Sequence, residues 1–156
     1  MLKQLESLSL NAEGRYATAQ ELKFIKDFVP TVDLRLSAYR KIRDAEDEII
    51  EQLEIEMRRQ QPAIFQTKSG DVSPLYQRDT KIVLRNASAA MLINDLDRLR
   101  EDLLLWQKTI TKAFQVRHIL AMTHKIMPEI IEEFLTPEEF DLVKPVLQLN
   151  QAILTD

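Results

Sequence analysis

The chain has 156 residues, of which 45% are apolar and 29% are charged, and its formal net charge is −4. This composition is typical of one ordinary globular domain. The negative charge argues against nucleic acid as a partner, because phosphate binding needs a concentrated basic surface. The chain contains no cysteine, which excludes disulfides, thiolate zinc sites, a cysteine nucleophile and any thioether-linked cofactor.

No targeting or membrane-spanning segment is expected. The N-terminal stretch MLKQLESLSLNAEGRY has no uninterrupted apolar segment of the signal-peptide type. No run of about 18 apolar residues occurs in the chain, so we expect no membrane span. We therefore expect a cytoplasmic protein.

Helices dominate the predicted secondary structure. Two glycines and six prolines punctuate the whole chain, and alternating β-branched runs are missing, so we expect an all-α fold. Capping boxes, in which a threonine and a glutamate three residues later satisfy each other's backbone N–H groups, occur at Thr18–Glu21 and Thr136–Glu139. The second has a proline at the first helical position, Pro137, where proline is favoured.

The stretch between Pro30 and Pro62 predicts one long amphipathic helix. Its apolar residues recur at spacings of three and four, and they are Val32, Leu36, Tyr39, Ile42, Ile49, Leu53 and Met57. The opposite face is rich in acidic residues from Asp44 to Glu56. We interpret this run as a solvated helix face rather than a metal site, because metal sites need carboxylates that converge from several elements.

Residues 66–75 form the clearest predicted loop, and 76–127 contain neither glycine nor proline. We expect this long segment to break at Asn94 and Asp95, where an aspartate can cap a new helix. An apolar seam then follows at three- and four-residue steps, and its members are Leu92, Leu96, Leu99, Leu103, Trp106, Ile110 and Ala113. The seam could be core or a subunit interface, and we favour core.

Two stretches of the sequence resemble a known family when they are taken together. The first is Asn11-Ala-Glu-Gly-Arg-Tyr-Ala-Thr-Ala-Gln-Glu-Leu22, and the second is centred on Val83-Leu-Arg-Asn86, with a Ser-Pro before Tyr76. In this order and separation they resemble the phycobiliproteins, the light-harvesting globin-fold subunits of cyanobacteria. The resemblance covers roughly residues 1–93 and implies a globin-like domain, residues 18–156, preceded by a short helical arm, residues 1–17.

The resemblance also implies a ligand site, because phycobiliproteins attach a linear tetrapyrrole (a bilin) through a cysteine. Val83 stands at the place of that cysteine, so no covalent bond can form there. Arg85 matches an arginine that pairs with a bilin propionate, and Asn86 replaces an aspartate that accepts from pyrrole N–H groups. Together with Tyr76 and Ala90, these residues form the candidate site for a non-covalently bound bilin. For Arg85, a salt bridge to an acid on a neighbouring helix is an equally open alternative.

The arm carries the candidate partner interface. The resemblance assigns it to Asn11, Glu13, Arg15 and Tyr16. Asn11 replaces an aspartate that pairs with an arginine of the complementary subunit in phycobiliproteins, which disfavours the usual hetero-dimer and ring assembly. We expect a homo-oligomer instead, and a homodimer in particular.

No nucleophile, paired acid–base set, phosphate loop or metal spacing stands out, so we expect a protein that is not an enzyme. The first hypothesis is a phycobiliprotein-like globin that binds a bilin non-covalently and assists bilin biosynthesis, delivery or turnover, with bilin-biosynthesis enzymes as possible partners. One alternative is an interaction protein in phycobilisome assembly or regulation that carries no chromophore. Another is a haem-based sensor globin using His118 or His124, although a single histidine in an apolar helix is more often a packing residue.

Overall fold

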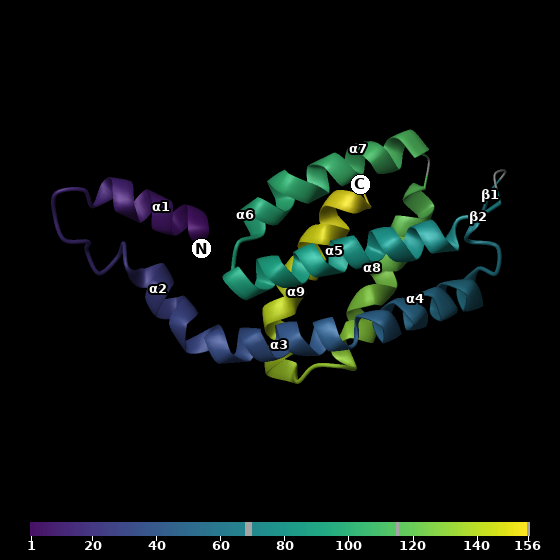
Figure 1. Ribbon diagram of the computed structural model, residues 1–156, viewed down its shortest axis with the longest axis horizontal. Helices are drawn as coiled ribbons and strands as arrows, with labels where there is room; N and C mark the ends of the chain where they lie inside the picture. The colour runs from purple at the N-terminus through teal and green to yellow at the C-terminus, as the bar shows by residue number, and fades with distance from the viewer. Residues whose placement is uncertain (68–69, 115, 156) are drawn as a thin grey trace.

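The computed structural model describes residues 1–67, 70–114 and 116–155, and it confirms the expectation of an all-α protein (Figure 1). The elements, in chain order, are α1 (Leu2–Asn11), α2 (Lys23–Phe28), the 3₁₀ turn η1 (Val29–Thr31), α3 (Val32–Asp44), α4 (Glu46–Gln60), β1 (Gln66–Thr67), β2 (Gly70–Asp71), α5 (Ser73–Ile93), α6 (Leu96–Leu99), the π-helical turn η2 (Arg100–Leu104), α7 (Leu105–Phe114), α8 (Arg117–Glu132) and α9 (Pro137–Leu154).

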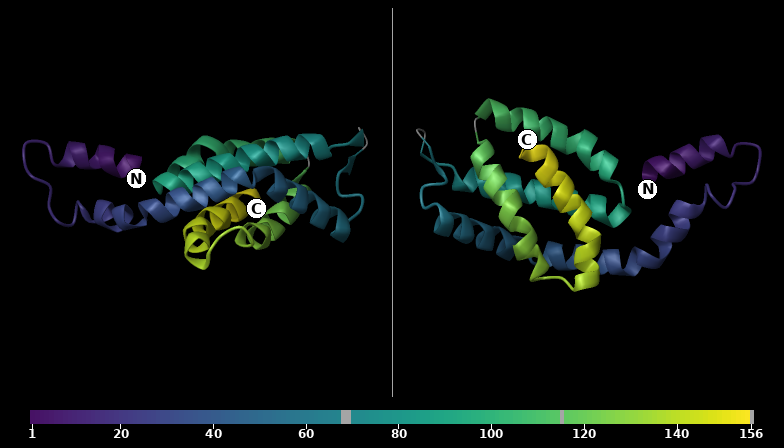
Figure 2. Two further views of the ribbon diagram at one scale, coloured as in Figure 1. Left: turned by 60° about the horizontal axis from the view of Figure 1, so that its bottom comes forward. Right: turned by 180° about the vertical axis from the view of Figure 1, so that it is seen from behind.

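Helices α1 and α2 form an arm at one end of the molecule, and the remaining helices surround a single core (Figures 1 and 2). Helices α3 and α4 run end to end along one side, α5 packs against both of them, and α8 and α9 cross behind. Apolar side chains from α3, α4, α5, α8 and α9 fill the interior, together with Phe65 from the segment between α4 and β1. The largest fully buried ones on the helices include Ile42, Ile49, Leu53, Met57, Leu84, Met91 and Met127.

Residues 30–62 form two helices, so the prediction of one continuous helix was wrong. Helix α3 ends at Asp44, and α4 begins at Glu46 after the junction residue Ala45 (φ −97°, ψ 6°). The charges favour a break at this point. Lys41 and Arg43 lie in the last turn of α3, where cations are stabilised by the helix dipole. The acidic residues that begin at Glu46 fall in the first turn of α4, where anions are stabilised.

The predicted break at Asn94 and Asp95 is confirmed. Asn94 ends α5 in the left-handed conformation (φ 51°, ψ 52°), which asparagine tolerates better than most residues. The Asp95 carboxylate then accepts a hydrogen bond from the Arg98 backbone N–H at 3.3 Å. A side chain with its own local hydrogen bond therefore starts the next helix, as the sequence indicated.

The outer half of the apolar seam is exposed, so the prediction that the seam is core was wrong there. Leu99 is 4% exposed and Leu104 is fully buried, but Trp106 is 62% exposed. The cause is the π-helical turn η2, which holds one residue more per turn than an α-helix. From the end of this turn onward, the buried positions are Leu104 and Thr111 instead of Leu103 and its successors in the seam. The later seam residues therefore face solvent.

The capping box at Thr136 and Glu139 is confirmed, and it does more than start α9. Both of its hydrogen bonds form, at 3.3 Å and 2.7 Å. The buried Glu139 carboxylate also accepts from the Ser37 hydroxyl (2.6 Å) and pairs with Lys41 Nζ (2.7 Å). Burial alone would raise the pKa of Glu139, but these donors outweigh it and hold the pKa at about 2.

Two further expectations are met in part. The hydrogen bonds between Thr18 and Glu21 form, at 2.8 Å and 3.3 Å, yet α2 begins only at Lys23. The 66–75 loop contains the antiparallel pair β1 and β2, which the sequence did not predict because two-residue strands carry no alternating pattern. Residues 68 and 69 of that loop lie outside the described part of the chain.

Candidate functional site

The candidate site lies along the middle of helix α5. The Asp71 carboxylate accepts from the Ser73 backbone N–H at 2.8 Å, and a proline in the first turn favours the start of this helix. Leu84 and Ala87 are buried against the core, at 2% and 3% exposure. Because the intervening positions of a helix point elsewhere, Arg85 emerges at the edge that faces helices α3 and α4.

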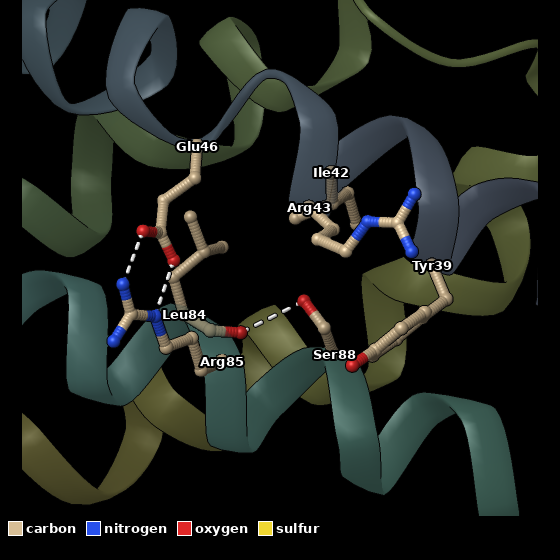
Figure 3. Close-up of a pocket in the computed structure, with 7 residues that line it drawn as sticks. All are labelled: Tyr39, Ile42, Arg43, Glu46, Leu84, Arg85 and Ser88. Carbon is tan, nitrogen blue, oxygen red and sulfur yellow. Dashed lines mark hydrogen bonds and ion pairs between the residues drawn. The ribbon is translucent and has the colours of Figure 1, made fainter.

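A cavity of about 220 Å³ opens beside Arg85, between α5 and the junction of α3 with α4 (Figure 3). Its lining combines an aromatic ring, two aliphatic side chains, a hydroxyl and three charged groups. The lining residues are Tyr39, Ile42, Arg43, Glu46, Leu84, Arg85 and Ser88. Two arginines against one glutamate give the lining a net positive charge, which favours an anionic ligand.

Arg85 is held by Glu46 through two hydrogen bonds. Its Nε donates to one carboxylate oxygen and its second terminal nitrogen to the other, each at 2.6 Å (Figure 3). This two-point geometry is the one that guanidinium and carboxylate groups prefer. The Glu46 carboxylate also raises the pKa of Arg85 above its ordinary value. Of the two alternatives for Arg85, the structure shows the salt bridge to an acid on a neighbouring helix.

Arg43 is the second guanidinium at the cavity, and it is less firmly held. Its Nε donates at 2.8 Å to Asp44, the next residue in the chain. Both side chains are largely exposed, at 60% and 65%, and exposed pairs of this kind contribute little because water screens them. Arg43 and Glu46 were missed by the sequence analysis, since the pairing of 43–46 with 84–88 depends on how two helices pack.

The other predicted site residues do not line this cavity. The Asn86 amide donates to the Ile82 carbonyl at 2.8 Å, and its side chain is exposed. Val83 and Ala90 are buried, at 3% and 6% exposure. The buried Tyr76 hydroxyl lies 3.2 Å from the Met57 sulfur, and burial raises its pKa to about 12. The cavity is lined by 39–46 and 84–88 rather than by the 66–75 segment.

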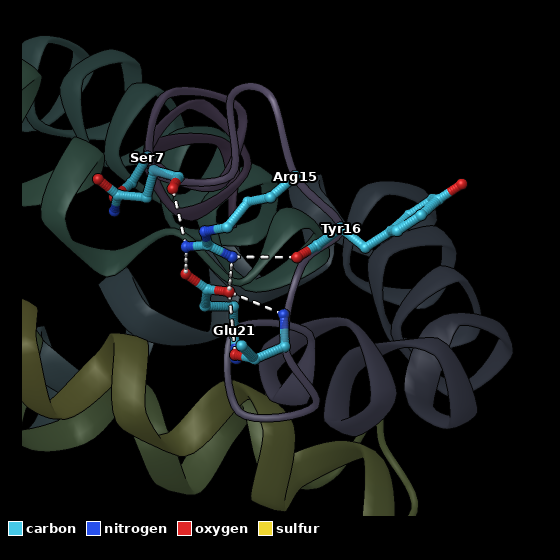
Figure 4. Close-up of polar contacts among 6 residues, drawn as sticks. Ser7, Arg15, Tyr16 and Glu21 are labelled. Atoms are coloured by element: carbon cyan, nitrogen blue, oxygen red, sulfur yellow. Dashed lines mark hydrogen bonds and ion pairs between the residues drawn. The ribbon is translucent and has the colours of Figure 1, made fainter.

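Among the candidate interface residues of the arm, Arg15 is the centre of a polar cluster within the chain (Figure 4). Arg15 pairs with both carboxylate oxygens of Glu21, at 3.0 Å and 2.7 Å, and also donates to the Asn11 carbonyl at 2.8 Å. The hydrogen bond from Arg15, followed by those from Thr18, lowers the pKa of Glu21 to about 2. Glu13 is exposed, and the Tyr16 side chain is 98% exposed.

The two histidines lie in different surroundings on α8. His118 is exposed, whereas His124 is 3% exposed and burial lowers the pKa of its imidazole to about 4. Across residues 1–67, 70–114 and 116–155, no cluster of three or more histidine, cysteine or acidic side chains is placed to hold a metal ion. In the same residues, no helix is long and apolar enough to cross a membrane.

Comparison with known proteins agrees with this fold. The family model described as "Phycobilisome protein" matches residues 8–153, which is nearly the whole chain. A search of curated proteins finds no match. The helical fold is that of a globin-like phycobiliprotein, and the absence of cysteine rules out thioether attachment of a bilin. With a match of this extent and an architecture that fits it, the chain belongs to the phycobilisome protein family.

Proposed function

We propose that this protein is a non-enzymatic phycobiliprotein-like globin that binds a linear tetrapyrrole reversibly and assists bilin synthesis, delivery or turnover. The observation that carries the proposal is the pair of guanidinium groups, Arg43 and Arg85, at one cavity beside α5. A bilin carries two propionates, and arginine is well suited to hold carboxylates in a two-point geometry. Without a cysteine to anchor the ligand, such binding is an equilibrium, as transfer between proteins requires.

The size of the cavity limits how the ligand is held. Pockets that enclose a drug-sized molecule measure about 300–1,000 Å³, and this cavity measures about 220 Å³. It would therefore receive the two propionate arms, packed against Ile42, Leu84 and Tyr39, while the rings of the ligand lie along the surface. Because the ligand stays partly exposed, we expect a dissociation constant on the order of micromolar, which is weak enough for release.

A titration of the purified protein with biliverdin and with phycocyanobilin tests this proposal. We expect a saturable change in the red absorption band, and we expect that denaturation in acid releases all of the pigment because no bond holds it. The absence of any change with up to 100 µM of either bilin would contradict the proposal. A Soret band after reconstitution with haem, without a response to bilins, would favour the sensor alternative instead.

A second candidate function is supported by a different observation. Helix α7 exposes large apolar side chains, namely Leu105, Trp106, Ile110 and Phe114. Contiguous exposed apolar surface commonly marks a contact with another protein. Because the outward part of the seam keeps the three- and four-residue spacing that lets two like helices pack, the occupant we infer is a second copy of the chain.

The homodimer has its own test. Light scattering over 1–100 µM should show concentration-dependent dimerisation that the substitution Ile110→Asp abolishes. The matched control is Ile55→Asp, which alters an exposed isoleucine on α4, a helix remote from α7 (Figure 1). A monomer at every concentration, or equal effects of the two substitutions, would contradict a role for α7 in self-association.

A further inference from the structure

The Glu46 carboxylate binds the Arg85 guanidinium in the way that the carboxylate of a ligand would. Both of its oxygens accept from the guanidinium at 2.6 Å, one from the Nε and the other from the second terminal nitrogen, so this edge of Arg85 is taken by Glu46. A propionate can form the same side-on pair, through the Nε and that terminal nitrogen, only by displacing Glu46. We propose that Glu46 is an internal competitor that sets the affinity and the ligand selectivity of the cavity, an inference that rests on the proposed function.

The two partners differ in how firmly they are held. Glu46 is the first residue of helix α4, and its side chain is 16% exposed. The Arg85 side chain is 64% exposed. The carboxylate is therefore fixed by its surroundings, while the guanidinium can turn toward solvent or toward a ligand at the cavity mouth. Exchange of one carboxylate for another conserves the number of charge-assisted hydrogen bonds at Arg85, but it leaves the largely buried Glu46 carboxylate without its two bonds. This cost is what an incoming propionate has to outweigh.

Arg43 determines which ligands gain from this exchange. It lines the same cavity and is paired only weakly, by its exposed neighbour Asp44. A ligand with two carboxylates can bind Arg43 first and then compete with Glu46 for Arg85 at a high local concentration. A ligand with one carboxylate, or with none, lacks this advantage. The site should therefore select a dianionic tetrapyrrole over its esters.

The substitution Glu46→Gln tests the competition directly. It keeps the shape of the side chain, removes the charge that holds Arg85, and should tighten the binding of biliverdin about three- to tenfold. The matched control is Asp47→Asn, which removes an acid from the same helical turn and breaks a comparable ion pair between α4 and α5, that of Asp47 with Lys81. Asp47 does not line the cavity, so this control should leave the affinity within twofold of the parent.

Two further measurements isolate the carboxylate. Biliverdin dimethyl ester, which has no free propionate, should bind the parent and Glu46→Gln equally. In the Arg85→Ala background, Glu46→Gln should lose its effect, because there is no guanidinium left to release. An unchanged or weaker biliverdin affinity in Glu46→Gln would overturn the inference while leaving the proposed function intact.

A small probe separates failure of this inference from failure of the proposed function. Glutarate, a dicarboxylate without a tetrapyrrole, should shift the Arg85 side-chain Nε–Hε signal in NMR spectra at lower concentration in Glu46→Gln than in the parent. If this difference appears but no bilin binds either protein, Glu46 competes for Arg85 and the proposed ligand is wrong. If neither glutarate nor bilin distinguishes the two proteins, the competitor role itself is excluded.

Discussion

Helix α7 and most of α5 come from the same stretch without glycine or proline, residues 76–127, but α5 buries most of its apolar side chains and α7 exposes many of its own. Helix α5 buries Leu84 and Ala87 and directs Arg85 toward an acid on a neighbouring helix. Helix α7 exposes Trp106 and Phe114 while it turns Thr111 toward the core. An apolar stripe in the sequence therefore identifies one face of a helix, whereas the packing of the helices decides whether that face is buried.

The origin of the difference is local. Helix α5 is regular from Ser73 to Ile93, whereas α7 follows the π-helical turn Arg100–Leu104. One extra residue in that turn rotates everything after it by roughly a quarter of a turn. The loss of stability on truncating a side chain along α7 should therefore depend on its burial after this rotation, and not on its place in the three- and four-residue pattern of the sequence.

The largest expected effect separates two adjacent leucines of this region. Leu104 is fully buried and Leu105 is 47% exposed. Leu104→Ala should lower the free energy of unfolding by about 2–5 kcal/mol because it leaves a cavity, whereas Leu105→Ala should cost less than about 1 kcal/mol. Urea denaturation of both variants measures this contrast. Equal losses would mean that the π-helical turn does not rotate the helix as described.

The second prediction concerns His124, a buried titratable group on α8. Burial lowers the pKa of His124 to about 4 from an ordinary value near 6.5. The unfolded chain therefore binds a proton between pH 6.5 and 4 that the native protein does not bind. Stability should fall by about 3 kcal/mol as the pH drops through this window, and should be regained as it rises.

The variant His124→Leu provides the reference for that measurement. Chemical denaturation at pH 7, 6, 5 and 4 should give a difference in stability between parent and variant that changes with pH only in this window. The stability contributed by the Glu139 carboxylate, whose pKa is held at about 2 instead of 4.5, is lost only as the pH falls below about 4.5, and this loss is shared by both proteins. A constant difference from pH 7 to 4 would show that His124 takes up its proton at the same pH in the native and in the unfolded protein, and would contradict the prediction.

The third prediction tests the polar edge of α5. Arg85→Ala should weaken the binding of biliverdin about tenfold while it leaves the helical circular dichroism spectrum unchanged. Lys81→Ala, one turn earlier on α5, removes the comparable ion pair to Asp47 and serves as the control. Absorbance titration gives both affinities. A loss of thermal stability in Arg85→Ala, with no bilin bound by the parent, would reduce Arg85 to a structural role.

The smallest effect concerns the polar side of α7. The Gln107 side-chain carbonyl is buried and has no hydrogen-bond partner among the described residues. A buried polar atom without a partner costs about 1–3 kcal/mol, so Gln107→Leu should raise the free energy of unfolding by about 1 kcal/mol. Thermal and urea unfolding would measure the gain. A loss of stability would indicate that this side chain has a hydrogen-bonding role in solution.

Features that depend on neighbouring residues were within reach of the sequence. The capping box at Thr136 and the break at Asn94 and Asp95 were predicted correctly, because each rests on hydrogen bonds within a few residues. The all-α class followed from the scarcity of glycine and the absence of alternating patterns. The lack of a covalent bilin also follows from the sequence, because no thiol exists to form the bond.

Features that depend on contacts between distant residues required the tertiary structure. The acidic run from Asp44 was interpreted as a solvated face, but Glu46 is 16% exposed and pairs with Arg85 across 39 positions of the chain. The outward rotation of α7 likewise depends on a single π-helical turn, which has no distinct sequence signature. A sequence specifies which side chains share one face of a helix, whereas packing energy summed over the whole core decides which neighbour that face meets.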